Sequence, residues 1–140
     1  MINDGAAPQV SQLRLVVEAD DFDQAVAFYR DSLGLVEEFY VESEGGAVVM
    51  ALRAGRATLE IVNPAQRRLI DEVEVGQEVS RSIRVAFQVA DAASATAQLV
   101  AAGADLVAPP TETPWRSLNS RLEAPAGLQI TLFEELEDIV

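Results

Sequence analysis

The chain has 140 residues, 49% of them hydrophobic, which is enough for one domain with a single buried core. Its 10 basic residues stand against 23 acidic ones, and the formal net charge of −13 argues strongly against the basic face that nucleic-acid binding requires. No apolar run approaches the roughly 20 residues that span a bilayer, and without cysteine there is neither a disulfide framework nor a thiolate metal site. We therefore expect a cytoplasmic protein without a nucleic-acid or membrane partner.

The first half of the sequence predicts one helix and four strands. A strand at 12–18 leads into a helix from Asp21 to Leu33, in which Asp21 and Gln24 form a capping box. Gly34 ends the helix, because glycine adopts the left-handed conformation of a helix C-terminus without strain. Three strand-like runs with alternating or continuous apolar residues follow. The predicted order is β-α-β-β-β.

The second half repeats this order about 70 residues later, with a strand at 83–89, a helix from Asp91 to Ala102 ended by Gly103, and a last strand at 128–133. One β-α-β-β-β unit has only a small sheet with a helix on its back, so its other face needs a partner. Two units side by side form a larger curved sheet whose concave face encloses a pocket. The sequence thus predicts an α+β fold in which paired βαβββ modules form a cupped, half-open mixed sheet.

The predicted domain organisation is a single domain, 1–140. Its two modules are joined by a connector and flanked by short loose termini, an arm at 1–10 and an acidic tail at 134–140. The parts are the module 12–63, the connector 64–80 and the module 81–134. Within the connector, Asn63 and Pro64 predict a short helix at 65–72, since proline is favoured at the first helical position after an asparagine cap.

The register between the two copies pairs Arg14 with Arg84 and Glu60 with Thr131, on the first and fourth strands of each module. The inward residues of these strands line the predicted pocket, so these four are the first candidate ligand-binding residues. Two guanidinium groups and one carboxylate in a partly dry cup are costly unless paired, and the simplest pairing has Glu60 bridging both arginines. If a ligand reaches them instead, the set offers one net positive charge and donors suited to a carboxylate, phosphate or enolate oxygen.

Further candidates for the pocket lie in the second half. Trp115 is the only tryptophan and either stacks on a planar ligand or packs in the core. Asn119 and Arg121 alternate on one face of the seventh strand, where they either add polar contacts to the pocket or face solvent, and we expect solvent exposure. Asp21 and Asp91 stand at junctions between strand and helix and are expected to be helix caps.

Several segments together resemble the vicinal oxygen chelate superfamily, which includes glyoxalase I, extradiol dioxygenases, fosfomycin-resistance transferases and bleomycin-resistance binding proteins. The resemblance covers residues 12–134, and the segments that carry it are 25–35, 57–60, 85–89, 113–115 and 124–134. It implies the glyoxalase/bleomycin resistance fold. The turn at 124–127 departs from the Asp-Pro-Asp-Gly form of many relatives.

The resemblance also locates a metal site that this chain does not reproduce. Metal-dependent members place His or Glu ligands at the positions held here by Arg14, Glu60, Arg84 and Thr131. Only Glu60 can bind a metal, because arginine has no lone pair to offer and the chain contains no histidine. We therefore predict no metal and no cofactor.

The functional prediction is a metal-independent protein that binds a small organic ligand, sequestering a drug or metabolite in the cup between the modules. The resemblance implies a homodimer, and the sequence leaves open whether the modules pair within one chain or across two. One alternative is a cofactor-free lyase or isomerase with Glu60 as the base and Arg14 and Arg84 stabilising an oxyanion. A second alternative is a metal-dependent glyoxalase or dioxygenase with ligands outside the matched positions.

Overall fold

The structure of the protein is a computed structural model that describes residues 7–137. One sheet of eight strands runs through it in the order β2-β3-β4-β1-β5-β8-β7-β6. The strands are β1 Val10–Glu18, β2 Val36–Glu42, β3 Val48–Ala54, β4 Ala57–Val62, β5 Ile83–Val89, β6 Asp105–Glu112, β7 Ser117–Ala124 and β8 Leu128–Glu135. The helices are α1 Phe22–Val26, η1 Ala27–Ser32, η2 Glu44–Gly46, α2 Pro64–Glu74, α3 Ala92–Ala101 and η3 Pro125–Gly127.

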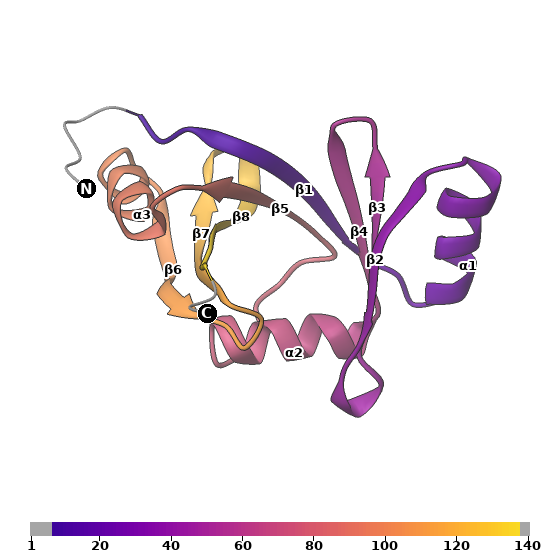
Figure 1. The fold of residues 1–140 in the computed structure, drawn as a ribbon. Coiled ribbons are helices and arrows are strands. Elements are labelled where there is room, and N and C mark those ends of the chain that lie inside the picture. The colour runs from indigo at the N-terminus through magenta and orange to yellow at the C-terminus, as the bar shows by residue number, and fades with distance from the viewer. Residues whose placement is uncertain (1–6, 138–140) are drawn as a thin grey trace.

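The strand pairing confirms the predicted α+β fold of two βαβββ units. Within each unit the first strand lies parallel to the last, β1 beside β4 and β5 beside β8. The two units meet where β1 and β5 pair antiparallel, with Arg14 opposite Ala86 and Val16 opposite Arg84. In Figure 1 the sheet arches from β6 to β2, and α1 and α3 lie at its two outer ends. A single chain therefore forms the complete cup.

Each half of the sheet packs its own helix against its outer face. In the first half this core contains Val26, Met50, Leu52 and Ile61. In the second half it contains Val89, Ala92, Ala95, Leu122, Ile130 and Leu132. In β1, β4, β5 and β8 alternate residues face the helices, so their sequence neighbours point to the concave face. None of the helices in residues 7–137 is long and apolar enough to cross a membrane.

The helix starts confirm the predicted caps. The side-chain oxygens of Asp21, Asn63 and Asp91 each accept a hydrogen bond from the backbone N–H three residues further on, at 2.9 to 3.1 Å. The first helix differs from the prediction, because after Val26 it widens into the π-helix η1, and the N–H of Leu33 bonds the carbonyl of Phe28. Gly34 then ends it at φ +87°, as predicted.

The connector helix α2 is longer than predicted and lies across the concave face (Figure 1). It delivers two carboxylates to Arg121, whose Nη1 lies 3.0 Å from Asp71 Oδ1 and whose Nη2 lies 2.6 Å from Glu74 Oε1. All three residues are buried, and Ser80 also hydrogen-bonds the Asp71 carboxylate. The expectation that Asn119 and Arg121 face solvent is wrong, because α2 covers that face of β7 with carboxylates that pair them.

The termini are shorter than predicted. Strand β1 begins at Val10, inside the expected arm, and β8 continues through Glu135, inside the expected tail. Residues 1–6 of the expected arm and 138–140 of the expected tail lie outside the described residues.

Replacing Arg121 with Met is expected to lower the free energy of unfolding by about 3–5 kcal/mol, since it leaves buried carboxylates of α2 without their cation. Urea unfolding followed by circular dichroism measures the effect. Arg68→Met is the matched control, because Arg68 is exposed on the same helix and the same atoms are removed. Equal small losses in both variants would show that the cluster does not hold α2 in place.

Candidate functional site

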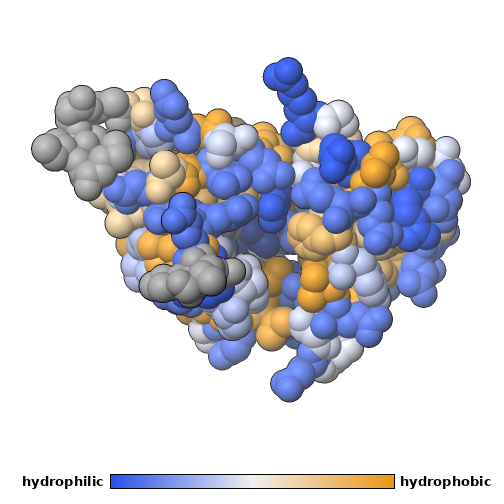
Figure 2. Space-filling view, viewed as in Figure 1, coloured by the Kyte–Doolittle hydropathy of each residue, from blue (hydrophilic) through white to orange (hydrophobic). Residues whose placement is uncertain are grey.

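A cavity of about 400 Å³ opens on the concave face between the two halves of the sheet. Figure 2 shows the molecule hollowed there. The structure brings all six residues predicted for the site to this cavity, and they are Arg14, Glu60, Arg84, Trp115, Asn119 and Thr131. The remaining lining residues are Val16, Ile70, Glu74, Ala86, Arg116, Ser117, Phe133, Glu135 and Leu136.

The strand register spaces the charged groups along the cavity wall. Val16 of β1 lies opposite Glu60 of β4 on one side and Arg84 of β5 on the other. Neighbouring strands are about 4.8 Å apart, so the Cα atoms of Glu60 and Arg84 are separated by roughly twice that distance. The valine between them carries no charge, and the cavity opens above it.

Arg84 is 6% exposed, yet it forms no ion pair with any residue of 7–137. Its Nη1 donates a hydrogen bond of 2.6 Å to Thr131 Oγ1. Burial lowers the pKa of the Arg84 guanidinium, against the opposing effect of the Glu74 and Glu60 carboxylates. A buried cation without a bound anion is unfavourable, so the position favours an anionic ligand.

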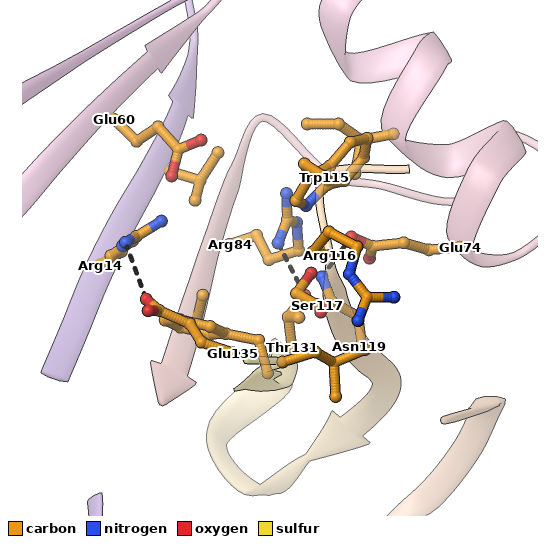
Figure 3. A pocket seen from close by; sticks show the side chains of 15 residues that line it. Arg14, Glu60, Glu74, Arg84, Trp115, Arg116, Ser117, Asn119, Thr131 and Glu135 are labelled. Carbon is orange, nitrogen blue, oxygen red and sulfur yellow. Dashed lines mark hydrogen bonds and ion pairs between the residues drawn. The ribbon is translucent and has the colours of Figure 1, made fainter. Parts of the chain in front are cut away.

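The predicted bridge from Glu60 to Arg14 and Arg84 does not form. In Figure 3 the Glu60 side chain points into the space between the two arginines, and no hydrogen bond or ion pair joins it to either. Burial raises the pKa of the Glu60 carboxyl, and the neighbouring Glu74 and Glu38 add to the rise, while Arg14 and Arg84 oppose it. The carboxyl therefore takes up a proton more readily than a glutamate in water.

Arg14 turns away from Glu60 toward the end of β8. Its Nη2 lies 3.8 Å from Glu135 Oε1, and its guanidinium carbon lies 4.9 Å from the centre of the Phe133 ring and 5.8 Å from that of Phe39. The Nε of Arg14 is buried and has no hydrogen-bond partner among residues 7–137. Because the pair with Glu135 is loose and half-exposed, the guanidinium remains able to contact a ligand.

Glu74 is the cavity residue that the sequence analysis missed. One carboxylate oxygen binds Arg121, and the other accepts a hydrogen bond of 2.8 Å from Asn119 Nδ2. The Oδ1 of Asn119 is buried without a partner in the described chain. The connector lies outside the two repeated modules, so no equivalent residue in the other module indicated where Glu74 would lie. The signal in the sequence was that Asp71 and Glu74 are three residues apart, which places two acids on one face of a helix that can pair with arginines of the strands.

Trp115 stands at the mouth of the cavity, 48% exposed, in the turn between β6 and β7. This turn is tied to the end of β8, since Leu136 N–H donates to the carbonyl of Arg116 at 3.0 Å. Arg116 adopts φ 63°, an uncommon conformation for a residue with a side chain, and its Nη1 bonds Glu112 Oε2 at 2.7 Å. The indole is thus held beside the cavity rather than packed in a core.

The residues at the matched positions do not fit a metal ion. Glu60 supplies the one carboxylate among them, and the two arginines place positive charge where a cation would sit. In residues 7–137 no group of three or more His, Cys, Asp or Glu side chains is placed to hold a metal.

The fold and its cleft between paired modules define a member of the vicinal oxygen chelate superfamily. A family model described as a glyoxalase-like domain matches residues 14–133, and the chain belongs to that family. This confirms the resemblance and the fold inferred from the sequence. Comparison with curated protein sequences gives no match.

Solved structures show the same architecture at low identity. A methylmalonyl-CoA epimerase from Mycobacterium tuberculosis has a TM-score of 0.68 and 19% identity, covering 94% of this chain and 93% of that chain. A hypothetical protein from Bacillus halodurans C-125 has a TM-score of 0.69 and 13% identity, covering 96% and 99%. A glyoxalase/bleomycin resistance protein/dioxygenase superfamily member from Vibrio splendidus 12B01 has a TM-score of 0.58 and 11% identity, covering 89% and 98%. These similarities show the fold alone.

Arg84→Met is expected to leave the free energy of unfolding unchanged or to raise it by about 1–4 kcal/mol, because it replaces an unpaired buried charge with an apolar side chain of similar length. The lost hydrogen bond to Thr131 offsets part of the gain. Urea unfolding without ligand, beside Arg121→Met, makes the comparison. A loss as large as that of Arg121→Met would mean that Arg84 serves the fold and not a ligand.

Proposed function

We propose that the protein binds a small organic anion in the cavity between its modules, without a metal, and so sequesters a drug or metabolite. The observation that carries this proposal is Arg84, a buried guanidinium without an ion pair that faces the same cavity as Arg14. A carboxylate placed between them accepts charge-assisted hydrogen bonds and neutralises the buried cation. The described residues give Arg84 no ion pair, and the Glu60 carboxylate that points between the two arginines is hydrogen-bonded to neither.

The volume of the cavity and the apolar part of its lining support a ligand with an apolar body. Its volume of about 400 Å³ lies within the range of small-molecule sites. Among the charged and polar groups of its lining stand the apolar side chains of Val16, Ile70, Ala86, Phe133 and Leu136. Trp115 offers a half-exposed aromatic face at the mouth. A planar or aromatic group attached to the anion suits this wall.

The assembly and location remain proposals of the same kind. We propose a homodimer, as the resemblance implies, and a cytoplasmic location on the basis of the chain's composition. Because a single chain brings Arg14, Glu60, Arg84 and Thr131 to one cavity, the dimer is not needed to complete the site.

Trp115 is the chain's only tryptophan, so its fluorescence reports directly on the cavity. Phenylacetate is expected to shift the emission to shorter wavelength as it displaces water from the indole, while the neutral phenylacetamide binds much more weakly. Arg84→Met should weaken phenylacetate binding about 10- to 100-fold, the loss of a hydrogen bond to a charged group. Arg68→Met is the control and should bind as the wild type does.

A wider thermal-shift screen removes the dependence on one probe. It includes small carboxylates, phosphates, planar cationic drugs and divalent metals, since any ligand of the native state raises the melting temperature. Shifts from anions alone support the proposal. A large metal-induced shift that a chelator reverses, or stoichiometric metal in protein purified without added ions, would contradict it and favour a metal-dependent glyoxalase or dioxygenase.

One observation favours a second function, a cofactor-free lyase or isomerase. Glu60 is not neutralised by a bridge, its pKa is raised by burial, and the guanidinium groups of Arg14 and Arg84 lie on either side of it. A base so placed can remove a proton next to a carbonyl group while the arginines stabilise the enolate oxygen.

Exchange of carbon-bound hydrogen for deuterium tests this second function. The protein is incubated in heavy water with small acids and thioesters that carry a proton next to a carbonyl, and proton NMR follows the loss of that signal. For an enzyme, Glu60→Gln should abolish the exchange and largely preserve binding of the same compounds. If the wild-type protein binds these compounds without exchanging their protons, the lyase or isomerase hypothesis is contradicted and the binding function stands.

A further inference from the structure

The charged residues that line the cavity balance one another. Three arginines and three glutamates line it, Arg14, Arg84 and Arg116 with Glu60, Glu74 and Glu135. The neighbouring ion pair between Arg121 and Asp71 adds no net charge. With every group ionised these six residues carry no net charge, and Glu112, which pairs with Arg116 outside the lining, adds one negative charge. A bound carboxylate therefore adds to a negative excess around the cavity.

Two of the three glutamates already have partners within the chain. Glu74 accepts hydrogen bonds from Arg121 Nη2 at 2.6 Å and from Asn119 Nδ2 at 2.8 Å. Glu135 lies 3.8 Å from Arg14, and its side chain is 58% exposed to solvent. Glu60 has neither a hydrogen bond nor an ion pair in the described chain, although it is partly buried in the wall.

We infer that a carboxylate ligand enters this cavity together with one proton, and that Glu60 is the group that takes up the proton. The inference rests on the proposed function and specifies the net charge that enters the site. A monoanion binds together with one proton, so the two add no net charge. The step is balanced, because the ligand carboxylate, the Glu60 carboxylate and one proton from solvent give the bound carboxylate and a neutral Glu60 carboxyl. No other bond is made or broken.

The groups that face Glu60 explain the direction of this coupling. Arg14 on β1 and Arg84 on β5 stabilise its charged form, while Glu74 on α2 and Glu38 on β2 destabilise it. A carboxylate seated on the two arginines cancels their effect and adds a further negative charge. Both changes raise the pKa of the Glu60 carboxyl beyond the rise that burial already causes. By linkage, ligand binding then weakens as pH rises above the pKa of Glu60 in the free protein.

The composition makes this coupling easy to observe. The chain has no histidine and no cysteine, so no side chain with an ordinary pKa titrates between about pH 5 and pH 8. Proton uptake in that range belongs to a perturbed carboxyl group or to the terminal amine, and a substitution of Glu60 separates the two.

Isothermal titration calorimetry tests the inference. Phenylacetate is titrated into the full chain at several values between pH 5 and pH 8, in two cationic buffers that differ in ionisation enthalpy. The difference in heat between the buffers gives the number of protons taken up. We expect uptake that approaches one proton as the pH rises, with affinity falling by up to about tenfold per pH unit. Glu60→Gln should bind phenylacetate without proton uptake and with affinity that does not change with pH.

Glu72→Gln is the matched control, because Glu72 is exposed on α2 and outside the cavity lining. It should keep the proton uptake of the wild type. If no carboxylate binds at all, the proposed function itself fails. If phenylacetate binds with no proton uptake, or if Glu60→Gln keeps the uptake, anion binding stands and this inference is overturned.

A measurement on the wild-type protein covers the case in which Glu60→Gln does not fold. With carbon-13 in the glutamate carboxyl groups, NMR follows the titration of Glu60 with and without saturating phenylacetate. The midpoint should move to higher pH in the complex. An unchanged or lower midpoint contradicts the inference.

Discussion

The position of helix α2 across the sheet depends on the ion pairs that Arg121 forms with Asp71 and Glu74. Without these ion pairs, the guanidinium of Arg121 on the concave face of β7 would have no anionic partner, and α2 would lose the contacts that hold it on the sheet. Burial alone would raise the pKa of Asp71, but hydrogen bonds from Ser80, Arg121 and Val79 together hold it below its ordinary value. The carboxylate therefore stays ionised, and the pair keeps α2 in place as the wall that closes the cup.

The two modules share a backbone plan but differ in what they present to the cavity. Arg121 lies opposite Thr131 in the second module, and the corresponding pair in the first is Ala51 opposite Glu60. The concave face of the first module carries a small apolar cluster of Val16, Val49 and Val62, with Phe39 packed against it. The concave face of the first module thus combines the charged Arg14 and Glu60 with this cluster, of which Val16 lines the cavity.

Much of this arrangement was predictable from the sequence because it follows from local periodicity and from the repeat. Helix caps at Asp21, Asn63 and Asp91 and the pairing of Arg14 with Arg84 depend on residues close in sequence or on the fixed register of equivalent strands. The partners of these side chains were not predictable in the same way. A long arginine chain reaches several acceptors, and Arg14 and Arg84 each turned to β8 instead of to Glu60.

The connector is the second source of error. Its helix was expected from Asn63 and Pro64. The repeat predicts the order and register of the strands, but it does not predict which face of the sheet the connector covers. Because α2 crosses the concave face, Asn119 and Arg121 are buried and not exposed to solvent as predicted, and Glu74 lines the cavity. The acids of α2 and the basic strand residues complement one another, and that complementarity is visible only when both are placed in three dimensions.

The contrast between the two buried arginines connects stability to function in this fold. Arg121 has its carboxylates within the chain, so its charge contributes to holding the structure together. Arg84 has no such partner, and the free protein carries an unfavourable buried charge at a position where the metal-dependent proteins that it resembles place a metal ligand. Two guanidinium groups there supply positive charge without a metal and with fixed donor directions. The proposed organic anion would be held here by hydrogen bonds and charge, and under the same proposal the protonation of Glu60 accompanies its binding.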